Sequence, residues 1–248
     1  MNTVIIIPAR FASVRFPGKP LVDIKGKTMI RRVYEKAIQT GMPAYVATDH
    51  ELIKQEVENF GGKVIMTSVD HKNGTERCNE ALNEIENQTG KKFELVVNIQ
   101  GDEPFIAIEN ILAVSEILNS GVADIATLVK KINTPALADD ANTVKAVFDI
   151  NGRALYFSRA AIPYLRDKND PAFTPDYFKH IGIYGYKATV LRKVVHLPEM
   201  PLERAEKLEQ NRWLESGYAI FIKETGFESP SIDTPDDLQN VLNNFNLI

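Results

Sequence analysis

The chain has 248 residues, of which 44% are hydrophobic, and it carries a formal net charge of −4 at pH 7. This length and composition fit one large globular domain, or one domain with an inserted lobe, that buries a sizeable core. The acidic balance lacks the basic field typical of nucleic-acid binders, so we expect no nucleic-acid partner.

The sequence also limits the cellular setting. Cys78 is the single cysteine, so no disulfide can form within the chain. The first ten residues, MNTVIIIPAR, lack the basic region, long apolar stretch and cleavage site of a secretory signal. No apolar run approaches the roughly 18 residues that a membrane span requires. We therefore expect a protein of the reducing cytoplasm without membrane insertion.

Short apolar runs rich in β-branched residues alternate with amphipathic stretches through the first hundred residues. This alternation predicts βαβ units, and the most apolar runs are typical of strands covered on both faces. The sequence therefore predicts a three-layer α/β fold with a mainly parallel sheet. The strand-like runs lie at 4–7, 44–48, 63–67 and 94–99, and the helical stretches at 29–40, 51–60 and 76–86.

The regular alternation of strand-like and helical stretches ends after about residue 130. Three strand-like runs, 144–149, 154–159 and 180–187, have no regular helix between them, and a polar loop with prolines precedes the third. We interpret residues 131–200 as a smaller mixed lobe within a single domain that spans 1–248. The chain then returns to a helix at 202–216, a strand at 218–223 and a last helix after the stretch SPSIDTPDDL.

Polar segments follow each predicted strand of the first half. Ligands of open parallel sheets bind beyond the carboxyl ends of the strands, so we expect these segments to share one rim. They are the cationic loop after the first strand, Asp49 after the second, DHKNGTER after the third and QGDEPF after the fourth.

The first of these segments, IPARFASVRFPGKPL, collects Arg10, Arg15 and Lys19 in a loop with three prolines, one glycine and no acid. Arginine matches phosphate oxygens in a bidentate manner and lysine supplies a mobile point charge, so the loop predicts an anion site. It contains neither the P-loop pattern nor GxGxxG, so side chains as well as backbone amides would hold the polyphosphate.

Two acids could complement a bound metal nucleotide. Asp102 directly follows a buried-type strand, where a carboxylate needs solvent, a partner or a cation. Asp233 lies in SIDTPDDL, a stretch that also looks like a helix start, so both a capping role and a metal role stay open for it. A turn or cap role is likewise the alternative for Asp102. Mg²⁺ prefers a few carboxylates together with phosphates and waters.

The order of these motifs resembles one known family. The motifs are IPARFASVRFPGKPL, VATDHE, DHKNGTER, VVNIQGDEPF, NTVKAV, ALYFSRAAIP, HIGIYGYK, EKLEQNRWLESG and IDTPDDL. They resemble, across residues 3–242, the 3-deoxy-manno-octulosonate cytidylyltransferases, the CMP-Kdo synthetases of bacterial lipopolysaccharide synthesis. The resemblance implies a Rossmann-like nucleotidyltransferase core and a homodimer with its interface in the smaller lobe.

The resemblance also implies a reaction in which the anomeric hydroxyl of the sugar acid Kdo attacks the α-phosphate of CTP, with Mg²⁺ present. It makes Arg10, Lys19, Asp102 and Asp233 catalytic, the two aspartates as metal ligands. It assigns CTP to Arg10, Arg15, Lys19, Asn73, Gly74 and Arg77. It assigns the sugar acid to Gln100, Arg159, His180, Tyr184, Glu209 and Gln210. One position departs from the family, which most often has serine where this chain has Asn73.

Alternatives stay open at this stage. The acceptor could be the 8-amino analogue of Kdo, or the chain could be another sugar-acid cytidylyltransferase. A nucleotide-binding module without turnover and a glycosyltransferase are the other classes, the latter disfavoured because Gly-Asp-Glu replaces a DxD-like pair. Glu209 is the most informative sugar-site residue, because a continuous helix over 202–216 would put its carboxylate on the apolar stripe.

Overall fold

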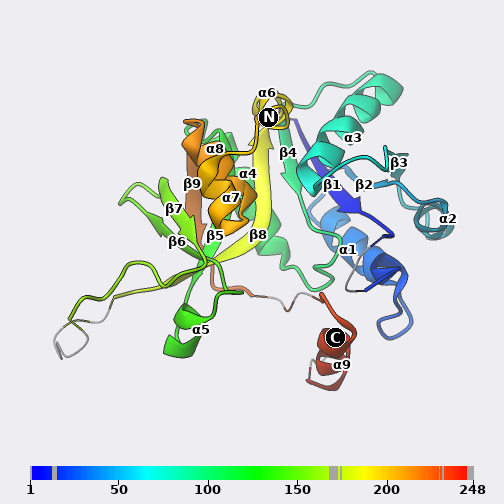
Figure 1. Cartoon of the computed structure of the whole chain (residues 1–248). Helices are drawn as coiled ribbons and strands as arrows, with labels where there is room; N and C mark the ends of the chain where they lie inside the picture. The colour runs from blue at the N-terminus through cyan, green and yellow to red at the C-terminus, as the bar shows by residue number, and fades with distance from the viewer. Residues whose placement is uncertain are drawn as a thin grey trace.

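The computed structural model describes residues 2–12, 16–167, 173, 175–228, 230 and 232–244. Arg15, one of the predicted loop cations, lies outside these residues. A single mixed sheet forms the centre of the described chain, with its main strands in the order β3-β2-β1-β4-β8-β5-β9 (Figure 1). Only β8 in this row runs antiparallel to its neighbours. The predicted mainly parallel α/β fold is confirmed.

The strands match the apolar runs of the sequence. They are β1 (Thr3–Ala9), β2 (Ala44–Thr48), β3 (Val64–Met66), β4 (Leu95–Asn98), β5 (Ile125–Lys131), β6 (Lys145–Phe148), β7 (Ala154–Ser158), β8 (Phe178–Lys187) and β9 (Ile220–Glu224).

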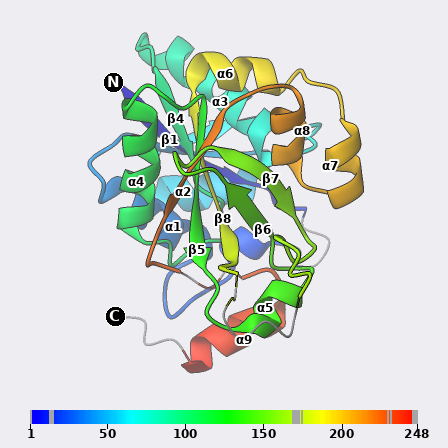
Figure 2. The same ribbon diagram turned by 90° about the vertical axis from the view of Figure 1, so that its left-hand side faces the viewer.

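Helices cover both faces of the sheet and complete three layers. Helices α1, α2 and α4 pack on one face, and α3, α6 and α8 pack on the other (Figure 2). None of the helices in the described ranges is long and apolar enough to cross a membrane. The helices are η1 (Lys19–Leu21), α1 (Met29–Ile38), α2 (Glu51–Asn59), α3 (Gly74–Thr89), α4 (Ile108–Asn119), α5 (Pro135–Asp139), α6 (Ala188–Val194), α7 (Pro201–Glu206), α8 (Glu209–Glu215) and α9 (Pro235–Asn244).

Strand β1 shows why helices must cover both faces of the sheet. Val4 and Ile6 point into the cluster under α3 and α6, whereas Ile5 and Ile7 point into the cluster under α1 and α4. All four side chains are fully buried. Because successive side chains of a strand face opposite sides and each buried aliphatic contributes about 1.5–3 kcal/mol, both layers stabilise this strand.

Strands β6 and β7 form a hairpin off the main row, and β6 pairs with the start of β8. Strand β8 itself lies in the middle of the main sheet, between β4 and β5. The predicted lobe of residues 131–200 therefore contributes one strand, β8, to the main sheet. The division of the chain into a core and a lobe with these bounds stays a prediction.

The helix expected at 202–216 is two helices. Lys207 adopts a left-handed conformation with φ 54° and ends α7, and α8 begins two residues later at Glu209. The prediction of one continuous helix was wrong, because nothing in the apolar spacing signals a left-handed residue that is neither glycine nor asparagine. Glu209 is therefore the first residue of a helix and not a member of an apolar stripe.

Helix α9 lies below the sheet in Figure 1, on the side of β1 and α1. There Ile232, Leu238 and Val241 pack with Ile24 and Met29 in a third apolar cluster. This packing brings the segment before α9 to the loop that follows β1.

Candidate active site

A cavity of about 400 Å³ opens at the carboxyl ends of β1 and β4 and the start of α3. Three of the four segments predicted to share one rim line this cavity, and Asp49, the fourth, does not. The cavity is lined by Pro8, Ala9, Arg10, Lys19, Pro20, His71, Lys72, Asn73, Gly74, Arg77, Gln100, Gly101, Asp102 and Asp233.

Two glycines let the backbone segments of this rim approach one another. A Cβ on Gly101 would lie 2.8 Å from the carbonyl oxygen of Pro8, and one on Gly74 would lie 3.2 Å from Cγ of Pro8. Any side chain at Gly101 would push the turn after β4 away from β1. Glycine at this position therefore sets how close Asp102 lies to the cationic loop.

Lys19 joins the two predicted metal ligands. Its ammonium donates to Asp102 Oδ2 at 2.6 Å and to Asp233 Oδ1 at 3.0 Å, although the acids are far apart in sequence. The Lys19 side chain is only 12% exposed. The backbone also connects these segments, since the N–H of Ile232 donates to the carbonyl of Asp102 at 3.2 Å. One cation thus lies between two carboxylates at the cavity wall.

The structure separates Asp233 from the helix cap that its motif suggested. The N–H of Asp237 donates to Thr234 Oγ1, and Asp237 Oδ2 accepts from the N–H groups of Thr234 and Asp233. Thr234 and Asp237 therefore form the cap of α9, a reciprocal arrangement typical of helix starts. The Asp233 carboxylate contacts Lys19 instead.

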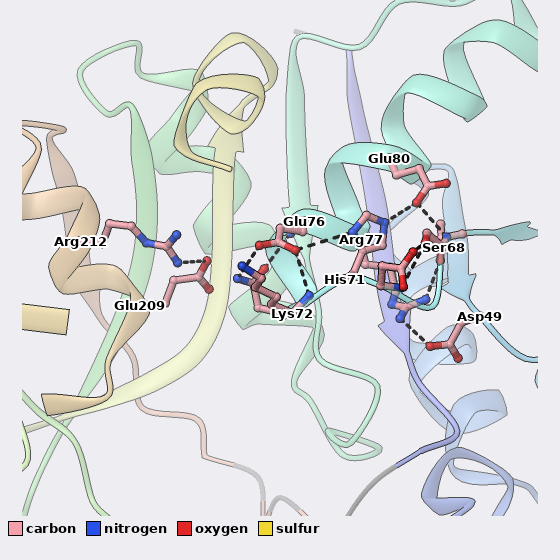
Figure 3. Close-up of polar contacts among 12 residues, drawn as sticks. Asp49, Ser68, His71, Lys72, Glu76, Arg77, Glu80, Glu209 and Arg212 are labelled. Carbon is pink, nitrogen blue, oxygen red and sulfur yellow. Dashed lines mark hydrogen bonds and ion pairs between the residues drawn. The ribbon is translucent and has the colours of Figure 1, made fainter. Parts of the chain in front are cut away.

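Arg77 is held by a buried ion pair. Its guanidinium donates to Asp49 Oδ2 and to Thr67 Oγ1, both at 2.6 Å (Figure 3). The Arg77 side chain is 4% exposed, so its charge needs this partner. Sequence reasoning placed both residues on the rim but missed their pairing, which joins the end of β2 to α3.

Asn73, predicted to meet the cytidine, is the cap of α3. Its Oδ1 accepts from the N–H of Glu76 at 2.8 Å. Beside it the side chains of His71 and Lys72 line the cavity, and neither was predicted. The His71 ring contacts Glu80, and no bond of the Lys72 ammonium to another described side chain is formed.

The predicted sugar-acid residues are spread over adjoining hollows. Gln100 lines the main cavity, Glu209 lines a second hollow that shares Lys72 and Asn73 with it, and His180 lines a third. Arg159 and Gln210 line none of these three hollows.

Glu209 accepts from Thr75 Oγ1 at 2.9 Å and from Arg212 Nη2 at 3.2 Å, and Figure 3 shows the pair with Arg212. Burial raises the pKa of its carboxyl to about 7, while Thr75 and Arg212 oppose this rise. The side chain keeps 27% exposure through the second hollow. Glu209 is therefore half-buried at the start of α8, where Thr75 and Arg212 bond it, and does not lie on the apolar stripe that a continuous helix would have formed.

His180 and Tyr184 lie together on β8, with ring centroids 5.3 Å apart. Burial lowers the pKa of His180 to about 3, so its ring is neutral. The Thr127 hydroxyl donates to the carbonyl of Ile183 at 2.7 Å, so it accepts from Nε2–H of His180 at 2.9 Å. Burial and the Glu209 charge raise the pKa of Tyr184, whose hydroxyl has no hydrogen-bond partner among the residues that the structure describes.

The Arg159 guanidinium bonds backbone carbonyls of two other segments. It donates to the carbonyls of Glu206 at 2.8 Å and Ala141 at 3.0 Å. The fully buried Lys145 bonds the Arg159 carbonyl in turn. Pairing with a substrate carboxylate would require the remaining donors of the guanidinium.

Comparison with known proteins agrees with this geometry. A family model described as cytidylyltransferase matches residues 4–224. A 3-deoxy-manno-octulosonate cytidylyltransferase of Bacteroides thetaiotaomicron is 49% identical over 95% of this chain and 94% of its own. The chain belongs to the 3-deoxy-manno-octulosonate cytidylyltransferase family. It is a nucleotidyltransferase, as the resemblance of its motifs predicted.

Two further comparisons bear on this cytidylyltransferase. An 8-amino-3,8-dideoxy-manno-octulosonate cytidylyltransferase of Shewanella sediminis is 48% identical over 96% of each chain. A solved structure described as CMP:2-keto-3-deoxy-manno-octonic acid synthetase complexed with CTP superposes with a TM-score of 0.90, 40% identity and 98% coverage of each chain. The fold of this chain therefore matches that of a solved nucleotidyltransferase over almost its whole length.

Proposed function

We propose that this cytidylyltransferase transfers CMP from CTP to the anomeric hydroxyl of 3-deoxy-D-manno-octulosonate (Kdo), giving CMP-Kdo and pyrophosphate. The observation that carries the proposal is the cavity at the sheet rim. There Arg10 and Lys19 face the same space as Asp102 and Asp233, in a chain that matches named Kdo cytidylyltransferases over nearly its whole length.

The cations of the cavity suit a triphosphate. Arg10 is exposed and forms no ion pair with other described residues, so its guanidinium can meet phosphate oxygens without losing a partner. Lys19 lies across the same space and can turn from the two carboxylates to a phosphate. Arg77 and Asn73, which are engaged with Asp49 and with the α3 cap, would instead shape the wall beside the nucleotide.

The acids of the cavity suit Mg²⁺. Asp102 and Asp233 already share one cation, the Lys19 ammonium, which stands where a metal could bind both. Within the described ranges no cluster of three His, Cys, Asp or Glu side chains forms a ready ligand set, so phosphate and water oxygens would complete the shell. When bound, Mg²⁺ would neutralise the triphosphate and favour ionisation of the attacking hydroxyl.

The transfer is an in-line displacement. The anomeric oxygen forms a bond to the α-phosphorus, the bond from that phosphorus to the αβ bridging oxygen breaks, pyrophosphate leaves, and the hydroxyl proton is lost to water. Positioning and charge neutralisation dominate such reactions. Arg10 and Lys19 would hold the triphosphate so that its α-phosphorus faces the acceptor.

The acceptor would lie toward β8 and α8. His180, with its Nε2–H given to Thr127, keeps Nδ1 as an acceptor for a sugar hydroxyl. The Glu209 carboxylate, which lines the second hollow, offers a further partner, whereas the Tyr184 hydroxyl is buried and would need a shift of its surroundings to meet the sugar. Gln100 lies at the boundary between this region and the nucleotide cavity. Arg159 and Gln210 line none of the three hollows and would join the site only after a local rearrangement.

The 8-amino analogue of Kdo is the second candidate acceptor. Relatives named for that analogue are as similar to this chain as those named for Kdo, at 48% and 49% identity. The two acceptors differ by an ammonium in place of a hydroxyl, so a carboxylate near that end would favour the amine.

Pyrophosphate release tests the proposal and separates the acceptors. Purified protein is incubated with CTP and Mg²⁺ and with Kdo, 8-amino Kdo or sialic acid, each supplied alone. We expect release with Kdo, weaker release with the 8-amino analogue and none with sialic acid. Release with sialic acid alone would assign the chain to another cytidylyltransferase activity, and CTP binding without release would favour a binding module.

We further propose that the chain acts as a cytoplasmic homodimer that supplies lipopolysaccharide synthesis. The hairpin of β6 and β7 leaves Ile150 and Leu155 exposed, and Tyr164 follows it with 78% exposure. Exposed apolar side chains gathered on one lobe are typical of an interface. Sedimentation of the wild type and of Leu155→Glu tests the dimer, which should dissociate in the variant.

A further inference from the structure

Thr75 joins the two halves of the site. It is the second residue of α3 and follows Asn73 and Gly74, which line the nucleotide cavity. Its own side chain is 3% exposed and donates through Oγ1 to Glu209 Oε2 at 2.9 Å. Thr75 therefore contacts the sugar-acid half from a segment whose neighbours form the nucleotide half.

The bond fixes the Glu209 carboxylate. One oxygen accepts from Thr75 and the other from Arg212, so two donors on different helices set the plane of the carboxylate. Without the threonine hydroxyl, one oxygen would lose its donor and the carboxylate could rotate. A buried acceptor without its donor is costly, and this cost is greater for a charged group.

The start of α3 forms part of the wall of the nucleotide cavity. A Cβ at Gly74 would lie 3.2 Å from Pro8 and 3.7 Å from Gln100, so there is little room between this residue and the cavity wall, and Asn73 caps the helix. A ligand that binds along this wall fixes the backbone from which Thr75 reaches Glu209. On the basis of the proposed function, we infer that Thr75 is a positioning residue that orients the Glu209 carboxylate for the sugar acid.

The same bond favours the ionised form of Glu209. Burial raises the pKa of Glu209 to about 7, and the hydrogen bond from Thr75 is the first of the effects that lower it. Removing the hydroxyl should therefore move the pKa higher. The titratable or charged groups around this carboxylate are Arg212, Glu203, Glu76, Tyr184, Tyr186 and Cys78.

Thr75→Val removes the hydroxyl and keeps the shape, and Thr75→Ser is the matched control that keeps the donor. We expect Thr75→Val to raise KM for the sugar acid roughly tenfold, the change given by loss of one hydrogen bond to a charged group. KM for CTP should change by less than about twofold, because the cavity wall is intact. The acid limb of kcat/KM should move to higher pH, and Thr75→Ser should restore wild-type behaviour.

A titration independent of turnover completes the test. NMR of protein labelled with ¹³C at glutamate carboxyls, assigned through Glu209→Gln, should give a higher Glu209 pKa in Thr75→Val than in the wild type. An unchanged Glu209 titration and sugar-acid KM would overturn the inference. An equal rise in KM for CTP would make Thr75 a structural residue of α3. If the wild type releases no pyrophosphate with any acid, the proposed function fails, while the titration still decides the role of Thr75.

Discussion

The Lys19 ammonium lies 2.6 Å from Asp102 Oδ2, closer than it lies to any other described carboxylate. The pair joins the predicted triphosphate cation to a predicted metal ligand. In the nucleotide-free protein, Lys19 neutralises the acids that Mg²⁺ would bind. In the proposed function the same ammonium would contact the phosphates of the metal nucleotide, so this relationship predicts that Lys19 exchanges carboxylate partners for phosphate partners.

Lys19→Met should separate these two roles. Without the ammonium, Asp102 and Asp233 lose the cation that they share, and a divalent cation should bind the protein more tightly when no nucleotide is added. Turnover should fall by at least about 100-fold, because a charge that stabilises the transferring phosphates is lost. Mn²⁺ binding measured by electron paramagnetic resonance and pyrophosphate release provide the two readouts. Weaker Mn²⁺ binding in the variant would show that the metal lies elsewhere.

Asp233 and Asp237 lie four residues apart and have different contacts, so each serves as a control for the other. Asp233→Asn should lower turnover by roughly 100-fold or more but leave stability within about 1 kcal/mol, since its contact with Lys19 is partly exposed. Asp237→Asn should instead weaken the α9 cap by about 1 kcal/mol and leave most activity. Thermal unfolding and turnover at several Mg²⁺ concentrations distinguish the two. Near-normal turnover in Asp233→Asn would remove this residue from the metal site.

Glu209→Gln should change how stability depends on pH. The pKa of Glu209 in the folded protein, about 7, lies above its ordinary value of 4.5. The folded state therefore holds more protons than the unfolded state between these values, and stability declines as pH rises through this window. Glutamine resembles the neutral acid, so the variant should match the wild type near pH 4.5.

At pH 8 the same variant should be more stable than the wild type, by up to roughly 3 kcal/mol at about 1.4 kcal/mol per pH unit of the window. Solvent that reaches Glu209 through its hollow will reduce this gain. Urea unfolding at the two pH values measures the effect, and Glu58→Gln, at an exposed position of α2, is the control. A gain of equal size at both pH values would mean that Glu209 does not titrate in this range.

The sequence predicted the sheet because β1, β2 and β4 are apolar enough to be buried on both faces. It also predicted the rim, since the carboxyl ends of parallel strands meet at one edge. The break between α7 and α8 was not predictable, because Lys207 carries no local signal for a left-handed conformation.

The partners of site residues were also beyond the sequence. Arg77 could be placed on the rim by the strand before it, but its pairing with Asp49 depends on how α3 packs against β2. Asp233 contacts Lys19, whereas Asp237 caps α9. This difference depends on the third apolar cluster, whose packing places the segment before α9 next to Lys19. Such long-range pairs arise from packing and leave no periodic pattern.

Oxygen labelling tests direct transfer to the sugar acid most sharply. CTP carrying ¹⁸O at the αβ bridging position is incubated with Kdo, Mg²⁺ and the wild-type protein, and both products are analysed by mass spectrometry. Attack of the anomeric hydroxyl on the α-phosphorus predicts that all of the label leaves in pyrophosphate and that CMP-Kdo carries none. Label retained in the nucleotide product, or consumption of CTP without a CMP-sugar, would contradict the account.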